Sequence, residues 1–363
     1  MNYNKIVQGI LDIGEALLQR GAENFRLEDS FYRMCRSYGF KRSDVFVIPS
    51  NIQVTVETPE GEIITQIRHI ESSEPNFDQL DYLNNLCRYV CQHTPDENEM
   101  REKYLEVINR EPQKRITRYA AGIMGGTGFA VFFGCNLWDA VIAFIVSVMI
   151  VAVGDWLAKR ESNLLVYNGI LAFISEVIII GALKMGIAEH PDRIMIGIVM
   201  LLISGLSTTN GIRDLLQRDF ISGFINIMNS FLGAAGIAFG IGLAIILFHE
   251  GYSDHFILNH SVPIQLLSCT VACTGFALWF KIRGKQVWYN SIGAFFTWAI
   301  YVAVYAVKPS NFMATMIAAG FVGFYAFIMS RVNKAPSTIF LTASVFPLIP
   351  GPNLYYVMYA CVS

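Results

Sequence analysis

Hydrophobic and polar positions alternate over short distances in the first 115 residues of the chain. Apolar residues recur at helical spacing in two stretches, and three β-branched runs with two-residue alternation follow them. The predicted elements are helices at 6–18 and 25–38, strands at 43–50, 51–59 and 62–70, and helices at 77–91 and from Pro95, with Thr94 as the N-cap of the last helix. The pattern predicts a small α+β domain at 1–115.

A different pattern begins near residue 119, where long apolar runs alternate with short polar connections. The runs fall at 119–135, 137–154, 164–183, 193–212, 222–248, 261–280, 286–307, 310–330 and 337–349, and a tenth begins at Leu354. Each of the nine is roughly long enough to cross about 30 Å of hydrocarbon. The sequence therefore predicts an α-helical polytopic membrane protein behind the α+β domain.

Two of these runs contain similar glycine-bearing interruptions. The fourth ends in LLISGLSTTNGIRD and the ninth in FPLIPGPNLYYV. We expect two halves of five helices, which enter the membrane in opposite orientation because five is odd. The predicted halves are residues 116–250 and 251–363. The second half has four helices and a truncated fifth. We expect that the rest of this fifth helix is either lost or supplied by another chain.

Breaks of this kind expose backbone polar groups, which are tolerated in a membrane when they are buried in protein or line a wet cavity. Ser204 and Gly205 in the first break, with Pro350 and Gly351 in the second, are therefore candidates for the transport path.

The distribution of positive charge predicts the orientation in the membrane. Twelve Lys and Arg residues fall on one side of the predicted segments, and only Lys184, Arg193 and Lys308 fall on the other. We therefore expect the α+β domain to face the cytoplasm; no signal peptide is recognised at its start. The twelve are Lys114, Arg115, Arg118, Lys159, Arg160, Arg213, Arg218, Lys281, Arg283, Lys285, Arg331 and Lys334.

Composition limits the other classes of function. The chain has 363 residues, 53% hydrophobic and 15% charged, with a net charge of -2 and no basic stripe, so a nucleic-acid partner is not expected. The seven cysteines form no C-x-x-C pair, and no histidines have metal-ligand spacing, so we expect no metal site and no cofactor. The expected partners are a small-molecule substrate and the lipid bilayer; a homo-oligomer is left open.

Polar residues within the apolar runs are the remaining candidates for the path. Glu176 lies deep in the third run, where a charge costs several kcal/mol unless it is paired, hydrated or protonated. It is either a proton-coupling carboxylate or a neutral one that is hydrogen-bonded to a neighbouring helix. Asn168 precedes it by two turns, and Asn229 lies near the start of the fifth run.

Asn210, Arg213 and Asp214 follow the first break. They either bind the carboxylate and ammonium groups of a zwitterion or anchor the interface. In the first domain, Gly21, Arg26 and Glu28 mark a charged helix start that is either a regulatory, substrate-sensing surface or an ordinary solvated face. The domain has no G-x-S-x-G and no glycine-rich phosphate loop, which argues against a hydrolase.

Three segments carry a resemblance that covers nearly the whole chain. GAENFRLEDSFYRMCRSYG, SGLSTTNGIRDLLQRDFISG and KAPSTIFLTASVFPLIPG resemble the threonine/serine exporter (ThrE) family. The resemblance implies a cytoplasmic N-terminal domain followed by ten helices in a bacterial inner membrane. It also implies export of threonine and serine driven by the proton motive force. The chain departs from the family at Ser204, where a proline commonly precedes the glycine, and in the absence of a complete final helix.

We therefore predict a secondary active transporter that exports small amino acids, and not an enzyme. Two alternatives remain at this point: a dicarboxylate exporter of the succinate type, and a membrane-anchored sensor or hydrolase whose activity lies in the N-terminal domain.

Overall fold

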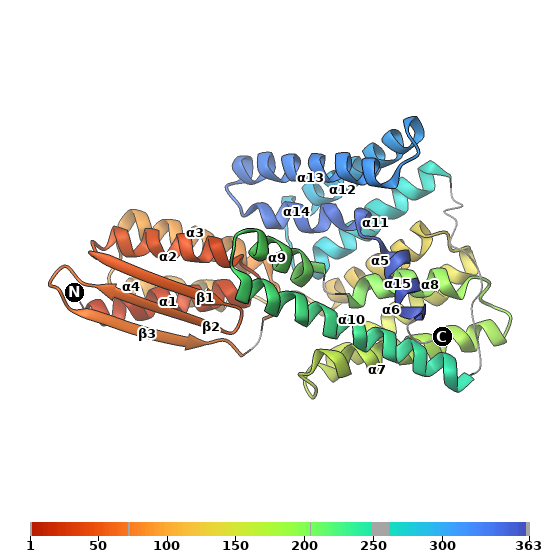
Figure 1. Cartoon of the computed structure of the whole chain (residues 1–363), viewed down its shortest axis with the longest axis horizontal. Helices are drawn as coiled ribbons and strands as arrows, with labels where there is room; N and C mark the ends of the chain where they lie inside the picture. The colour runs from red at the N-terminus through yellow and green to blue at the C-terminus, as the bar shows by residue number, and fades with distance from the viewer. Residues whose placement is uncertain (1, 72, 204, 249–260, 361–363) are drawn as a thin grey trace. The chain divides into compact units, whose positions relative to one another are not determined.

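The computed structural model describes residues 2–71, 73–203, 205–248 and 261–360 (Figure 1). These residues form two compact units. One comprises Met1–Pro112 with Ser207–Ile227, and the other comprises Gln113–Leu206 with Met228–Ser363. The chain passes from the second unit into the first directly after the first predicted break.

The N-terminal part of the first unit has the predicted order of two helices, three strands and two helices. The strands form an antiparallel sheet in the order β1-β2-β3, and α1 packs against β2 and β3. Ile52, Val54 and Val56 of the central strand are buried on one face of the sheet because side chains alternate along a strand. The elements are α1 (Tyr3–Gln19), α2 (Asn24–Ser37), β1 (Arg42–Ile48), β2 (Asn51–Glu57), β3 (Ile63–His69), α3 (Phe77–His93) and α4 (Glu97–Ile108).

One capping prediction is wrong. Thr94 has left-handed backbone angles, with φ of 43°, and ends α3. The N-cap of α4 is Asp96, whose carboxylate accepts hydrogen bonds from the backbone N–H groups of Asn98 and Glu99. Aspartate is a strong N-cap residue, so the N-cap of α4 is Asp96, two residues after the predicted Thr94.

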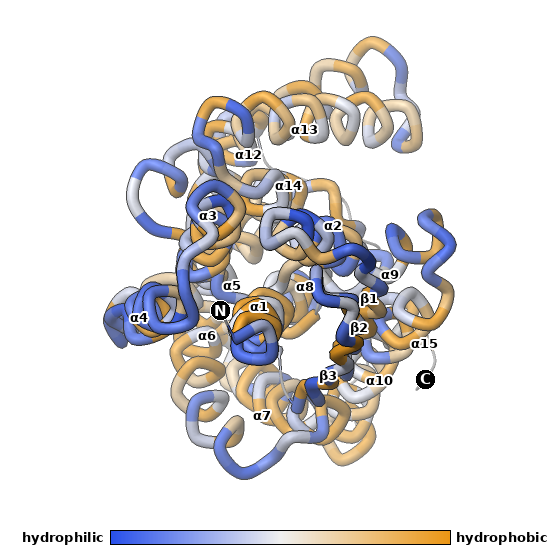
Figure 2. The backbone as a smooth tube through the Cα atoms, turned by 90° about the vertical axis from the view of Figure 1, so that its left-hand side faces the viewer, coloured by the Kyte–Doolittle hydropathy of each residue, from blue (hydrophilic) through white to orange (hydrophobic). Residues whose placement is uncertain are grey.

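The rest of the described chain is helical, and α9 and the start of α10 belong to the first unit. In Figure 2, α7, α10 and α13 are mainly hydrophobic, whereas α4 is mainly hydrophilic. The helices are α5 (Arg115–Phe132), α6 (Leu137–Leu157), α7 (Leu164–Lys184), α8 (Pro191–Leu202), α9 (Gly205–Leu216), α10 (Phe220–Phe248), α11 (Val262–Trp279), α12 (Lys285–Val307), α13 (Asn311–Asn333), α14 (Ser337–Val345) with the 3₁₀ turn η1 (Phe346–Leu348), and α15 (Gly351–Ala360).

The fold-class prediction of a polytopic helical membrane protein with a small N-terminal α+β domain is confirmed. Among the described residues, six helices are long and apolar enough to cross a membrane, namely α6, α7 and α10 to α13. A seventh is obtained if the bent pair of α8 and Ser207–Leu216 counts as one span. This is fewer than the nine complete crossings predicted, because α5 begins with two arginines and is rich in glycine, and α14 has only 9 residues.

Helices α5 to α9 and helices α11 to α15 have the same spacing along the sequence. Each of α11 to α15 begins 146 to 148 residues after the corresponding helix of the first set. The packing repeats as well: α5 contacts α6 and α8, and α11 contacts α12 and α14. Likewise, α6 contacts α7 and α8, and α12 contacts α13 and α14.

The first helices of the two sets, α5 and α11, cross each other in antiparallel directions. A Cβ built on Gly125 would approach Phe276, and one built on Gly128 would lie 2.9 Å from backbone atoms of Ala272. A Cβ on Gly275 would lie 2.5 Å from the backbone nitrogen of Gly125. Small residues therefore let the two backbones come close.

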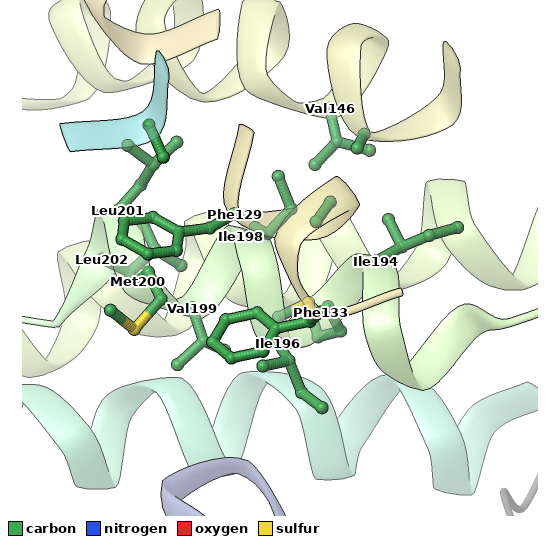
Figure 3. Close-up of a cluster of buried hydrophobic side chains, with 14 of the residues drawn as sticks. Phe129, Phe133, Val146, Ile194, Ile196, Ile198, Val199, Met200, Leu201 and Leu202 are labelled. Carbon is green, nitrogen blue, oxygen red and sulfur yellow. The ribbon is translucent and has the colours of Figure 1, made fainter. Parts of the chain in front are cut away.

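Aromatic and aliphatic side chains fill the space beside this crossing. The rings of Phe129 on α5 and Phe276 on α11 occupy corresponding positions and lie 5.6 Å apart. Phe346 stacks on Phe276 at 4.0 Å. Figure 3 shows Phe129 and Phe133 among the buried side chains of α8, so the core of this unit surrounds that helix.

Candidate functional site

The first helix break separates α8 from α9. Helix α8 ends at Leu202, and Ile203 is extended, with φ of -73° and ψ of 128°. Ser204, a predicted path residue, lies outside the described residues. The last carbonyl groups of any helix lack intrahelical partners, so a break inside a hydrophobic core needs donors from elsewhere.

Asn168 on α7 supplies such a donor. Its side-chain Nδ2 donates to the carbonyl of Leu202, at 3.5 Å, and to the carbonyl of Gly233 on α10, at 3.2 Å. The side chain is only 2% exposed. Asn168 therefore joins the end of α8 to two neighbouring helices, α7 and α10.

The second break separates η1 from α15 and has almost the same backbone geometry. Ile349 is extended, with φ of -69° and ψ of 127°, and Gly351 begins the next helix. The N–H of Gly351 donates to the carbonyl of Ile349 at 2.8 Å, as the N–H of Gly205 donates to the carbonyl of Ile203 at 3.0 Å. Pro350 is exposed and Gly351 is buried.

The two breaks lie beside each other although 146 residues separate them in the sequence. A Cβ built on Gly205 would lie 3.5 Å from Cδ1 of Ile349. A Cβ built on Gly351 would lie 3.0 Å from the sulfur of Met200, which precedes the first break. The structure thus brings together the two glycine-bearing segments that the sequence identifies.

Glu176 lies on the same helix as Asn168 but not at the breaks. Its side chain is 0% exposed, and eight residues along α7 correspond to about 12 Å. Between them, Ser175 donates its hydroxyl hydrogen to the carbonyl of Leu171, one turn back in the same helix. Glu176 is therefore a buried carboxyl at a distance from the break, and Asn229 is exposed on α10.

The polar residues after the first break contact the N-terminal domain. Arg213 forms an ion pair with Glu23, next to the start of α2. The Asp214 carboxylate accepts hydrogen bonds from Asn24 at 3.3 Å and from Asn226 at 3.0 Å. This arrangement anchors Arg213 and Asp214 on the N-terminal domain, a contact that neither sequence-based interpretation included; Asn210, on the same helix, is half-buried.

The predicted motif of the N-terminal domain surrounds this anchor. Gly21 has φ of +91°, which favours glycine and lets the chain turn from α1 into α2. Arg26 lies 3.7 Å from Glu23. Burial raises the pKa of the Glu28 carboxyl, the charge of Asp219 raises it further, and a hydrogen bond with the Val47 backbone opposes the shift.

Sequence reasoning missed a second polar cluster, at the connections that precede α6 and α8. Asp139, which is 0% exposed, accepts hydrogen bonds from the backbone N–H groups of Glu189 and His190 and contacts the His190 ring at 2.9 Å. Asp192 accepts a hydrogen bond at 3.2 Å from the hydroxyl of Tyr356 on α15. The aspartate of the Asn136-x-x-Asp139 capping box was the available signal.

Replacing Asn168 by alanine is expected to slow substrate exchange about tenfold, because the Leu202 carbonyl at the break loses this donor and an unsatisfied buried group costs about 1–3 kcal/mol. Exchange is measured in proteoliposomes at matched protein content. Ser175→Ala is the matched control, since its hydroxyl bonds within its own helix. Equal rates for both variants would remove Asn168 from the site.

The known proteins that the chain resembles are transporters by name. A family model described as "Putative threonine/serine exporter" matches residues 8–248, and one described as "Threonine/Serine exporter, ThrE" matches residues 265–363. The "Threonine/serine exporter" of Corynebacterium glutamicum is 23% identical over 368 residues, covering 97% of this chain and 74% of that protein. The "Probable threonine/serine exporter" of Mycobacterium tuberculosis is 21% identical over 379 residues, covering 99% and 70%. No solved structure matches the chain.

Proposed function

Because the chain belongs to the threonine/serine exporter (ThrE) family, we propose that it exports threonine, serine or a similarly small amino acid from the cytoplasm. The observation that carries this proposal is the contact between the two helix breaks. Irregular backbone among membrane helices offers N–H and C=O groups that a small zwitterion needs, and transporters use such discontinuous helices for binding.

The chemistry of the breaks suits an amino acid. Helices α9 and α15 both begin at a break, and the N-terminus of a helix attracts a carboxylate. Helix α8 ends at the first break, and the C-terminal end of a helix attracts an ammonium group. In this proposal, the substrate binds at the paired breaks, beside Gly205 and Gly351, and Asn168 fixes the end of α8.

An inverted repeat is the second part of the proposal. Its support is the constant spacing of corresponding helices, their repeated packing and the antiparallel crossing of α5 and α11. Corresponding residues meet there: Phe129 contacts Phe276, as expected for residues near a pseudo-two-fold axis. In transporters with two such inverted halves, the halves move against each other, and the substrate site opens alternately to the inside and to the outside.

Coupling to the proton motive force is the third part, and it rests on Glu176. A carboxyl group that is 0% exposed inside an apolar helix is favoured when protonated or paired, so it suits the uptake and release of a proton. Its position about 12 Å along α7 from Asn168 separates the proton site from the substrate site.

The orientation and location follow from charge. The concentration of Lys and Arg on one side of the helices supports a cytoplasmic N-terminal domain. We place the protein in a bacterial inner membrane, where the lipid bilayer surrounds its helices. The amino acid is its small-molecule substrate.

A dicarboxylate exporter would require cationic side chains at the path. Arg213 was the obvious candidate, and it is ion-paired with Glu23 of the N-terminal domain. This observation favours an amino acid over a dicarboxylate.

Counterflow in proteoliposomes tests the substrate class. Vesicles loaded with unlabelled threonine are expected to accumulate labelled threonine and serine, whereas vesicles loaded with unlabelled succinate are expected to take up labelled succinate only at the level of protein-free vesicles. Accumulation of succinate alone would overturn the proposal in favour of the dicarboxylate exporter.

A further inference from the structure

The N-terminal domain forms one compact unit with α9 and the first turns of α10. The unit includes Ser207–Ile227, so it begins two residues after Gly205 of the first break. Contacts that hold this segment therefore act on α9, the helix that begins at the first break.

Four polar contacts attach the segment to the domain or brace it locally. The first is the ion pair of Arg213 with Glu23. In the second, the Asn24 amide donates to the Asp214 carboxylate; Asn24 is 5% exposed and Asp214 is 4% exposed. Asn226 donates to the same carboxylate from α10. In addition, Ser222 donates its hydroxyl hydrogen to the Val47 carbonyl of β1 at 3.4 Å.

Close packing makes α9 and the start of α10 a single element. A Cβ on Gly211 would lie 3.0 Å from the carbonyl oxygen of Gly223, and one on Gly223 would lie 2.9 Å from that of Gly211. Because packed helices move as bodies rather than deform, a force applied to this pair through Arg213 and Asp214 is transmitted to the start of α9.

We propose that the N-terminal domain is a clamp that restrains α9 and thereby slows the conformational change at the first helix break. This inference rests on the proposed transport function. Hydrogen bonds to a charged group are stronger than bonds between neutral groups, so the clamp stabilises the conformation in which it is formed. Weakening it lowers the barrier to leaving that conformation.

Charge reversal across the ion pair tests the clamp in the full-length protein. Glu23→Arg places a second positive charge beside Arg213. Arg213→Glu places a second negative charge beside Glu23. Each single variant is expected to raise the rate of threonine counterflow about tenfold, and the double variant to return it to within about twofold of the unchanged protein.

The matched control is Arg33→Glu, which breaks an exposed ion pair with Asp29 on the same helix and should leave the rate unchanged. Single variants that match the control, or that slow exchange, would overturn the clamp, as would a double variant that fails to restore the rate. All rates are normalised to folded protein recovered by size-exclusion chromatography. Absence of counterflow in the unchanged protein would instead overturn the proposed transport function.

Discussion

Replacing Glu176 by glutamine is expected to abolish threonine export driven by a pH gradient while threonine counterflow continues. Glutamine has nearly the same shape as glutamic acid and forms similar hydrogen bonds, but it cannot take up or release a proton. Because Glu176 is fully buried on α7 and lies away from the breaks, the substitution should leave substrate binding intact. The measurement is the accumulation of labelled threonine in proteoliposomes with an imposed pH gradient.

The matched control is Glu102→Gln, which changes an exposed carboxyl of α4 in the N-terminal domain. It should retain gradient-driven export within about twofold. Full gradient-driven export by the Glu176 variant would exclude this carboxyl as the proton carrier. Loss of both export and counterflow would point to a structural role for the side chain.

Replacing Gly128 by leucine is expected to prevent recovery of folded protein. A Cβ at this position would lie 2.9 Å from the backbone nitrogen and Cα of Ala272, so α5 and α11 would have to separate. Overpacking of a core costs about 1–3 kcal/mol even where side chains can adjust, and here the obstacle is backbone. The measurement is the yield of monodisperse protein and its thermal unfolding temperature in detergent.

Gly320→Leu on α13 is the control, because a Cβ there meets nothing within 4 Å. It should be recovered with the yield and unfolding temperature of the unchanged protein. A Gly128 variant that behaves like this control would contradict the close crossing of α5 and α11.

The sequence predicts the class of fold and the two breaks because both depend on local patterns. Apolar runs of about twenty residues specify helices in a membrane, and glycine beside polar residues interrupts them. Contact between the breaks cannot be read from such patterns, since it depends on how helices separated by 146 residues pack. Asn168 was predicted as a polar residue two turns before Glu176 in the same apolar run, but its bond to the Leu202 carbonyl required the fold.

The contacts of Arg213 could not be decided from the sequence for the same reason. Its nearest acidic neighbour in sequence is Asp214, but its ion-pair partner is Glu23, which lies 190 residues away in the chain. Near the end of α3, by contrast, the error was local: both Thr94 and Asp96 are suitable N-caps, and backbone angles decide between them.

Protection of a cysteine at the second break by substrate tests most directly whether the paired breaks form the transport path. Ile349→Cys is made in a cysteine-free background that retains counterflow, and Val357→Cys, 64% exposed on α15, is the control. Threonine and serine are expected to slow labelling of Ile349→Cys by a small thiol reagent and to leave labelling of Val357→Cys unchanged. Labelling of Ile349→Cys at the same rate with and without threonine, in a protein that exchanges threonine, would contradict the account.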